Sequence, residues 1–226
     1  MTLKLYGLPG ACSMAPHIIL EELGLDYDLV LVERDKLQEP EHLAVNPMAQ
    51  VPSLATDDGL LTESTAILLY LDEKYGDGRV SPPSGSWDRG QMIMRLMFIA
   101  TQEHPAFGLW LRPFRWLDDG DEQGRLKAAA EERFAVCFQR LEGWLEGRDW
   151  LIGDHMTLAD TLAFVHARWG LRVDPPTTEY PNIWRFAQRM TEVPSVARVL
   201  EQEGVALNAD PEAASDHIGD PINGFS

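Results

Sequence analysis

An α/β N-terminal domain followed by an all-α helical C-terminal domain is the fold class that the sequence predicts. Three observations predict it. Short strand patterns alternate with helical patterns in the first third of the 226 residues, a segment rich in Gly, Pro and Ser follows, and every later pattern is helical. We therefore expect a first domain over residues 1–78, a linker over 79–86, a helical domain over 87–204, and a polar acidic tail over 205–226.

The first half of the α/β domain has the pattern strand, helix, strand. Residues 3–6 form a short apolar strand that ends at Gly7, and residues 27–32 form a second strand. A helix between them begins after Ser13 and ends at Gly24, a residue typical of a helix C-cap. Its apolar positions are Ile18, Ile19, Leu20 and Leu23.

The second half has the pattern strand, strand, helix. Residues 51–55 form the third strand, and residues 57–59 turn the chain back into a fourth. An apolar helix over residues 65–71 follows and ends near Gly76. A β-α-β half followed by a β-β-α half is a thioredoxin-like unit.

Apolar residues at helical spacing predict the helices of the second domain. A long first helix extends over residues 92–114, and Pro105 should kink or break it because proline has no amide hydrogen. Residues 134–145 carry the stripe of a second helix. Thr157 begins a third helix, in which its hydroxyl can accept from the Asp160 amide while the Asp160 carboxylate reaches back to the cap amide. Two shorter helices follow at residues 182–191 and 195–202.

The composition excludes several classes of function. Lys and Arg total 19 and Asp and Glu total 36, a formal net charge of −17, which argues against nucleic acid and against a polybasic membrane contact. No apolar run has the length of a transmembrane helix, and the first residues do not resemble a secretory signal. The two cysteines, Cys12 and Cys137, have no metal-ligand spacing. We expect a cytoplasmic, reduced protein without a metal.

Five short blocks of sequence carry a family resemblance. They are residues 5–17, 46–54, 61–71, 99–104 and 153–160. Together, and in this order, they resemble the beta-class glutathione transferases of bacteria, part of the cytosolic glutathione transferase superfamily. The resemblance covers about residues 1–203. It implies glutathione as co-substrate, an electrophilic small molecule as second substrate, and a homodimer.

Glutathione transfer requires a thiolate, and Cys12 and Ser13 are the candidates to stabilise it. Lowering a thiol pKa from ~8.5 by ~2 units takes about 2.7 kcal/mol. A helix N-terminus contributes roughly 0.3–1 kcal/mol and a hydrogen bond to a charged group roughly 1.5–3 kcal/mol. One donor at the start of the first helix therefore accounts for most of the shift. Ser13 is a hydroxyl donor, and Cys12 is a donor, the partner of a mixed disulfide, or a small buried turn residue.

The resemblance also implies residues that bind glutathione. It implies a cis peptide bond before Pro52 and pairing of the Val51 backbone with the cysteinyl part of glutathione, where a trans edge-strand proline is the alternative. Gln50 belongs to the same block. Glu63 suits the γ-glutamyl ammonium, while Ser64 and the free amides beside it suit the carboxylate, although a plain helix cap also explains Ser64.

Further residues in both domains complete the predicted site. Lys36, or Arg34 beside it, resembles the basic position that contacts the glycyl carboxylate. The resemblance implies that His104 lines the cleft near the glutathione thiol, where a histidine exposed at a kink is the alternative. Tyr6 resembles the thiol-donating tyrosine of other classes and ranks below Ser13 and Cys12. Arg112, Arg115 and Trp169, with Arg168, are predicted either to form a wall for the second substrate or to pack as ordinary helix residues.

Three functions remain open. The first is a glutathione transferase that conjugates the thiolate to an electrophilic, hydrophobic small molecule, with detoxification as its role. The second is a glutathione-dependent thiol–disulfide oxidoreductase acting through Cys12. The third is a glutathione-binding or regulatory protein without catalysis.

Overall fold

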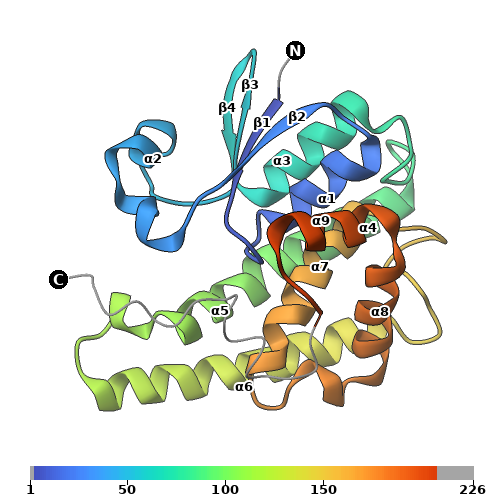
Figure 1. Ribbon diagram of the computed structural model, residues 1–226. Coiled ribbons are helices and arrows are strands. Elements are labelled where there is room, and N and C mark those ends of the chain that lie inside the picture. Colours follow the sequence, from blue (N-terminus) through green and yellow to red (C-terminus); the bar gives the residue numbers. More distant parts are fainter. Residues whose placement is uncertain (1–2, 208–226) are drawn as a thin grey trace.

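The four strands of the first domain form one mixed sheet, in the order β2-β1-β3-β4 (Figure 1). The computed structural model describes residues 3–207. β1 pairs in parallel with β2 and antiparallel with β3, and β3 pairs antiparallel with β4. The strands are β1 (Leu3–Gly7), β2 (Tyr27–Leu31), β3 (Ser53–Thr56) and β4 (Gly59–Thr62). The predicted thioredoxin-like order of strands and helices is confirmed.

Helix α1 (Met14–Leu23) lies at the centre of the molecule. Eight of its ten residues are buried, because it packs against α3 (Ser64–Leu71) and against two helices of the second domain, α7 (Leu158–Trp169) and α9 (Pro194–Glu203). It ends where predicted, at Gly24, whose φ of 63° lies in the left-handed region that glycine adopts without a steric penalty.

The chain between β2 and β3 forms a short 3₁₀ turn, Arg34–Gln38, and the helix α2 (Pro40–Val45). Neither element is predicted by the sequence patterns. Helix α3 continues into a π-helical turn, Asp72–Gly76, and so ends at the predicted glycine.

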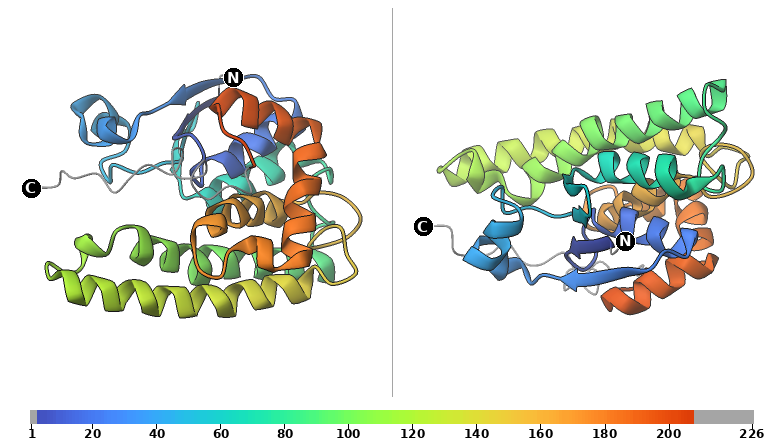
Figure 2. Two further views of the ribbon diagram at one scale, coloured as in Figure 1. Left: turned by 60° about the horizontal axis from the view of Figure 1, so that its bottom comes forward. Right: turned by 90° about the horizontal axis from the view of Figure 1, so that it is seen from above.

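The second domain is entirely helical over its described residues. Helices α5 (His104–Leu111) and α6 (Gly120–Trp144) run side by side along one edge of it (Figure 2). Its core is rich in phenylalanine; Phe107, Phe134 and Phe138 are each at most 1% exposed. Its helices that have not yet been described are α4 (Trp87–Phe98) and α8 (Pro181–Glu192).

The predicted first helix of this domain is interrupted close to Pro105. A π-helical turn, Ile99–Glu103, separates α4 from α5, and Pro105 is the second residue of α5. Proline is accepted in the first turn of a helix because the amide that it lacks would have no intrahelical partner there. The predicted break is therefore confirmed, and it places Glu103 and His104 at a helix junction.

The start of α7 is held by a buried carboxylate. Asp160 Oδ2 accepts from the amide of Thr157 at 2.8 Å and from its hydroxyl at 2.6 Å, and Oδ1 accepts from the amide of Leu151 at 2.8 Å. The capping box predicted for Thr157 and Asp160 is present. These contacts tie the loop before α7 to the helix.

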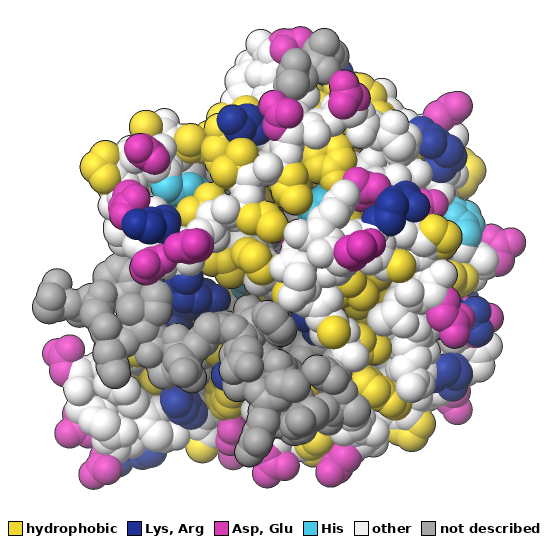
Figure 3. Space-filling view, in the orientation of Figure 1, with side chains coloured by type: hydrophobic (Ala, Val, Ile, Leu, Met, Phe, Trp, Pro, Cys, Tyr) yellow, Lys and Arg dark blue, Asp and Glu magenta, His cyan; other side chains and the backbone are white. Residues whose placement is uncertain are grey.

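Three further observations concern the charge of the surface, the possibility of a membrane-spanning helix, and the predicted acidic tail. Acidic side chains are scattered over the face seen in Figure 3, as the net charge of −17 requires. No helix among residues 3–207 combines the length and the apolar composition needed to cross a membrane. The predicted acidic tail lies mostly outside the described residues.

Candidate active site

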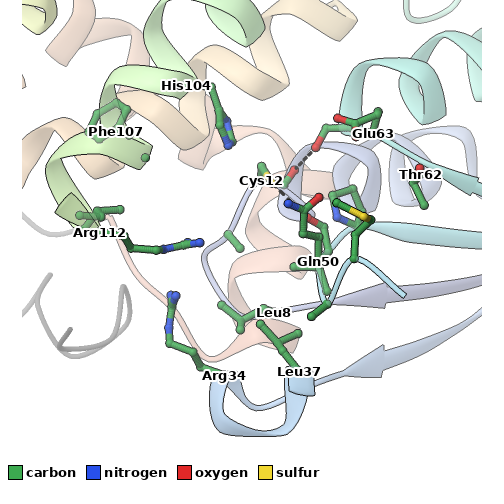
Figure 4. Close-up of a pocket in the computed structure, with 18 of the residues that line it drawn as sticks. Leu8, Cys12, Arg34, Leu37, Gln50, Thr62, Glu63, His104, Phe107 and Arg112 are labelled. Atoms are coloured by element: carbon green, nitrogen blue, oxygen red, sulfur yellow. Dashed lines mark hydrogen bonds between the residues drawn. The ribbon is translucent and has the colours of Figure 1, made fainter. Parts of the chain in front are cut away.

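A cavity of about 460 Å³ lies between the two domains. The first domain lines it with the loop after β1, the 3₁₀ turn after β2, the segment before β3 and the start of α3. The second domain lines it with α5, with the segment that follows α5, and with Leu162 and Trp169 of α7. Figure 4 shows the side chains of both domains pointing into this space.

Cys12 lies in the loop that connects β1 to α1 and faces the cavity. Its Sγ is 3.5 Å from the carbonyl oxygen of Val51, to which the thiol donates, and its own carbonyl accepts from Ser64 Oγ at 3.4 Å (Figure 4). Burial raises the pKa of the Cys12 thiol, while Ser64 and the charge of Arg112 lower it. The net shift is upward, so that Cys12 is a thiol and a hydrogen-bond donor at neutral pH.

Ser13 is adjacent to Cys12 but does not line the cavity. Its side chain is buried, and its hydroxyl accepts from the amide of Leu8 at 3.0 Å and donates to the carbonyl of Leu8 at 3.2 Å. The loop itself therefore satisfies this hydroxyl. Of the two candidate donors, the structure therefore brings Cys12 and not Ser13 to the cavity.

Tyr6 also lies away from the cavity. Side chains alternate between the two faces of a strand, and in β1 the residues Leu3 and Leu5 point into the core. Lys4 and Tyr6 share the opposite face, where Lys4 Nζ lies 5.3 Å from the centre of the Tyr6 ring. Tyr6 is therefore not placed to donate to a thiol in the cavity.

Of the two basic residues proposed near position 36, the structure brings only Arg34 to the cavity. Residues 34–38 form a 3₁₀ turn, in which side chains three positions apart share a face. Arg34 and Leu37 accordingly line the cavity (Figure 4). Lys36 does not, and its Nζ is paired with Glu39 Oε1 at 2.8 Å on the surface.

The segment before β3 presents its backbone to the cavity. Gln50, Val51 and Pro52 all line it, and the peptide bond between Val51 and Pro52 is cis, as the resemblance implied. The Gln50 carbonyl accepts from Asn46 Nδ2 at 2.9 Å and contacts His42 Nε2 at 3.3 Å. These two side chains fix the position of the segment.

Glu63 and Ser64 line the cavity at the start of α3. Glu63 has a φ of 66°, a left-handed conformation that is unusual for glutamate. Such backbone strain persists only where the surrounding structure enforces it and is concentrated at functional sites. The turn places a carboxylate, a hydroxyl and the first amides of a helix at one end of the cavity.

His104 extends from the first position of α5 into the cavity (Figure 4). Burial lowers its pKa to about 3, so that its ring is neutral at neutral pH. The ring centre lies 5.3 Å from that of Trp169, which also lines the cavity. The alternative of a histidine exposed at a kink is therefore wrong.

The remaining wall of the cavity combines apolar and basic side chains. Phe107 and Leu111 of α5 lie beside Arg112, which points toward Arg34 across the opening (Figure 4). Burial, together with the charges of Arg115 and Arg34, lowers the pKa of Arg112 to about 10. Arg168 is not part of this wall, because it is buried and donates to the Ala206 carbonyl at 3.2 Å.

Two residues of the second domain hold the loop that carries Cys12. Glu203 of α9 accepts from the amide of Gly10 at 2.8 Å through Oε2, and its Oε1 lies 2.8 Å from His17 Nδ1. Trp169 Nε1 donates to the carbonyl of Gly10 at 2.8 Å. No sequence pattern indicates this contact of Glu203, which is 193 residues from Gly10.

The comparisons with known proteins agree with this architecture. The family model described as glutathione S-transferase, N-terminal domain, matches residues 1–73, and the model for the C-terminal domain of the same family matches residues 92–194. The chain belongs to the glutathione S-transferase family. The predicted family is thus confirmed, with both of its domains.

Individual relatives cover most of the chain. The glutathione S-transferase GstA of Escherichia coli O157:H7 is 36% identical over 207 residues, covering 90% of this chain and all of GstA. The beta-class glutathione S-transferase of Sphingomonas chungbukensis is 33% identical, with a TM-score of 0.78, covering 90% of this chain and all of that one. A sphingomonad glutathione S-transferase solved in complex with glutathione is 35% identical, with the same TM-score and coverage.

No group of three or more His, Cys, Asp or Glu side chains within residues 3–207 is arranged to hold a metal ion. The charged and polar groups that line the cavity are instead those that a peptide with free carboxylates and an ammonium group would require.

Proposed function

We propose that this glutathione transferase conjugates the thiolate of glutathione to an electrophilic, largely hydrophobic small molecule. The observation that carries the proposal is the arrangement of donors around one cavity. Cys12, the backbone of Val51, and the Glu63–Ser64 turn come from three separate segments and lie around the same space. The fold alone does not require this combination.

Glutathione would satisfy its charged groups in the following position in this cavity. Its γ-glutamyl carboxylate would bind Ser64 and the first amides of α3, and its ammonium would bind Glu63. Its cysteinyl backbone would pair with Val51, beside Gln50 and Pro52, which places the sulfur near Cys12. The glycyl carboxylate would then extend toward Arg34, on the far side of the cavity.

In this position the thiol of Cys12 would donate to the glutathione sulfur. A protonated thiol can donate to the glutathione thiolate in place of the Val51 carbonyl, and the nearby charge of Arg112 favours a negative group at the same point. The thiol proton of glutathione leaves to solvent. The thiolate then attacks the electrophile and forms a carbon–sulfur bond, with a leaving group such as halide departing with the bonding electrons.

The electrophile would bind against α5 and α7. Phe107, Leu111 and Trp169 give this part of the cavity an apolar surface, and Arg112 lies at its edge. Apolar walls with few polar groups bind hydrophobic molecules by removing their surface from water. This supports an aromatic or otherwise hydrophobic electrophile.

Four further properties belong to this proposal. The protein would form a homodimer, act in the cytoplasm, and serve in detoxification. The glutathione-binding domain would end at residue 78 and the helical domain begin at residue 87, which is supported by the end of the π-helical turn at Gly76 and the start of α4 at Trp87. Sedimentation of the purified chain at twice its monomer mass would support the dimer, and sedimentation as a monomer would contradict it.

A binding and activity assay tests the function. The purified protein is expected to be retained on immobilised glutathione, to elute with free glutathione, and to conjugate glutathione to an aromatic halide. Retention without conjugation to any of a panel of halides, epoxides and α,β-unsaturated carbonyls would favour a binding protein. Failure to bind glutathione would contradict the proposal.

Replacing Cys12 with alanine separates conjugation from disulfide exchange. We expect Cys12→Ala to lower kcat/KM for conjugation about tenfold, the lower end of the value of a hydrogen bond to a charged group, because a thiol is a weak donor. Thiol–disulfide exchange should be abolished, since Cys12 is the cysteine that lines the cavity. Both activities are measured on the same preparation.

The control for this experiment is Cys137→Ala, because Cys137 is buried in α6 and does not line the cavity. It should keep both activities. Loss of disulfide exchange in Cys12→Ala, together with a glutathione adduct at Cys12 in the intact mass spectrum of the wild type during turnover of a glutathione disulfide substrate, would show that the exchange runs through a mixed disulfide at Cys12. Unchanged conjugation in Cys12→Ala would contradict the role of Cys12 as the donor to the glutathione thiolate.

A further inference from the structure

Three titratable side chains form a continuous hydrogen-bonded chain behind the cavity. His104 Nδ1 lies 3.1 Å from Nε2 of His166, and His166 Nδ1 lies 3.2 Å from Oε1 of Glu103. Glu103 is the last residue of the π-helical turn before α5, His104 is the first residue of α5, and His166 belongs to α7. Only His104 reaches the cavity.

The two inner members of this chain are fully enclosed. Glu103 and His166 both have an exposed fraction of 0%. The His166 ring is stacked on Trp169 at 4.8 Å between ring centres and lies against Phe107 at 5.5 Å. The second carboxyl oxygen of Glu103, Oε2, is buried without a hydrogen-bond partner. A carboxylate left in this way costs far more free energy than a protonated carboxyl group does.

The protonation states follow from this burial. Desolvation lowers the pKa of both His104 and His166 to about 3, so both rings are neutral at pH 7. Desolvation raises the pKa of Glu103 to about 8, so that its carboxyl group carries a proton at the same pH. Each neutral ring has one N–H donor and one bare acceptor nitrogen.

The buried Oε2 of Glu103 has no acceptor beside it among the described residues, so the carboxyl proton belongs on Oε1, and only one arrangement of the remaining protons then satisfies both hydrogen bonds. The protonated carboxyl group of Glu103 donates to His166 Nδ1. The proton of His166 must therefore be on Nε2, which donates to His104 Nδ1. The proton of His104 is then on its Nε2, the one ring nitrogen of the chain that has no hydrogen-bond partner within the described structure.

We propose that Glu103 and His166 are positioning residues that hold His104 in the tautomer whose Nε2–H donates into the cavity, toward the sulfur of bound glutathione. The ligand in this statement rests on the proposed function. The tautomer rests on the hydrogen-bonded chain and on the burial of Glu103, and it does not depend on a ligand.

Ionisation of Glu103 reverses the direction of both hydrogen bonds, so that His104 donates to His166 and His166 donates to Glu103. His104 Nε2 releases its proton to solvent, the proton of His166 Nε2 moves to His104 Nδ1, and the carboxyl proton of Glu103 moves to His166 Nδ1. One proton leaves and Glu103 becomes the anion. His104 then presents a bare nitrogen to the cavity, which accepts hydrogen bonds and does not stabilise a thiolate.

Few other charges act on Glu103. Helix α6 contributes Cys137, whose pKa rises in part because of the Glu103 charge, and Arg133, which is hydrogen-bonded to Gln102. On α4, the electrostatic partners of Arg95 are Arg148 and Asp160. His166 and His104 are the titratable groups from α7 and α5, and Arg112 acts on His104. The ionisation of Glu103 is therefore set by its burial.

Nitrogen NMR of the ligand-free protein labelled with ¹⁵N-histidine tests the tautomer directly, because protonated and bare ring nitrogens differ strongly in chemical shift. At pH 6.5 we expect both His104 and His166 to carry their protons on Nε2. Above about pH 8 both should change together to the Nδ1 form. Glu103→Gln, which cannot ionise and can still donate to His166, should show no change up to pH 10. His104→Phe assigns the signals.

Three NMR results would overturn the proposal. They are a His104 ring protonated on Nδ1 at pH 6.5, a ring that becomes cationic near its ordinary pKa, and a tautomer change that persists in Glu103→Gln. None of these results depends on glutathione.

The ultraviolet absorbance of the bound thiolate tests the role toward glutathione. His166→Phe keeps the stacking on Trp169 but breaks the chain, and it should raise the pKa of the bound thiol by about one to two units, the value of a lost hydrogen bond to an anion. In the wild-type protein kcat/KM for glutathione should fall about tenfold above pH 8, and in Glu103→Gln this fall should be absent. The same pKa of the bound thiol in His166→Phe and in the wild type would overturn this part.

The proposed function and the positioning role of Glu103 and His166 can each be wrong while the other stands. If the wild-type protein shows the predicted tautomers but binds no glutathione, the proposed function is wrong and the fixed donor serves another ligand. If it binds and conjugates glutathione but His104 shows the other tautomer, the proposed function stands and the positioning role is wrong.

Discussion

Replacing Ser64 with alanine is expected to weaken glutathione binding about tenfold to a hundredfold. Ser64 begins α3 and lines the cavity at the point where we place the γ-glutamyl carboxylate. A hydrogen bond to a charged group contributes roughly 1.5–3 kcal/mol, and about 1.4 kcal/mol is a factor of ten in affinity. Isothermal titration calorimetry with glutathione gives the dissociation constant.

Ser64→Thr is the matched control, because threonine keeps the hydroxyl at the same position. It should retain most of the affinity. The Ser64 hydroxyl also donates to the Cys12 carbonyl at 3.4 Å, so the comparison of the two variants should be made with the unfolding temperature measured in parallel. Equal affinity in the wild type and in Ser64→Ala would place the γ-glutamyl group elsewhere.

Replacing Glu203 with alanine is expected to give the largest loss of stability. The side chain is buried, and it accepts from the Gly10 amide and contacts His17, which is fully enclosed. Removing one member of a buried polar pair costs about 3–5 kcal/mol because the other member is left without a partner. In a chain of this size that corresponds to a drop in Tm of about 10 °C or more.

Glu203→Ala should also raise KM for glutathione, since Gly10 belongs to the loop that holds Cys12. Thermal unfolding and steady-state kinetics on the same preparation measure both effects. Glu201→Ala is the control, because Glu201 lies on the exposed side of the same helix. If the two variants unfolded at the same temperature, the contacts of Glu203 with the loop would carry no stability.

Local patterns were enough to predict the sheet and most of the long helices, although α6 begins at Gly120, well before the predicted stripe over residues 134–145. Gly24 ends α1 and Pro105 lies at the break between α4 and α5, and the backbone chemistry of each residue explains its position. Helix α2 was missed because it has six residues and only one of them, His42, is buried. A helix this short has no apolar stripe that a sequence pattern could reveal.

The candidate site was predictable where a short block of sequence determines both the position of a residue and the direction in which its backbone faces. Val51, Glu63 and Ser64 line the cavity because the backbone of each turn faces it. The direction of a side chain in an irregular turn is not encoded in this way. Ser13 bonds to Leu8 within its own loop, and Lys36 points away from a turn that directs Arg34 inward.

Contacts between distant helices leave no local signal at all. His166 is separated from Glu103 by 63 residues, and Glu203 is separated from His17 by 186. The first pair meets when α7 packs beside the π-helical turn before α5, and the second pair meets when α9 packs against α1. Buried polar residues in otherwise apolar helices are the one indication that the sequence offers, and it does not identify the partner.

A crystal structure of the protein with bound glutathione tests the central claim most directly. The account predicts the glutathione sulfur within hydrogen-bonding distance of Cys12 Sγ and on the side of the cavity that His104 faces, with the γ-glutamyl group at Ser64. A glutathione molecule bound in the opposite direction, or a sulfur remote from both Cys12 and His104, would contradict it.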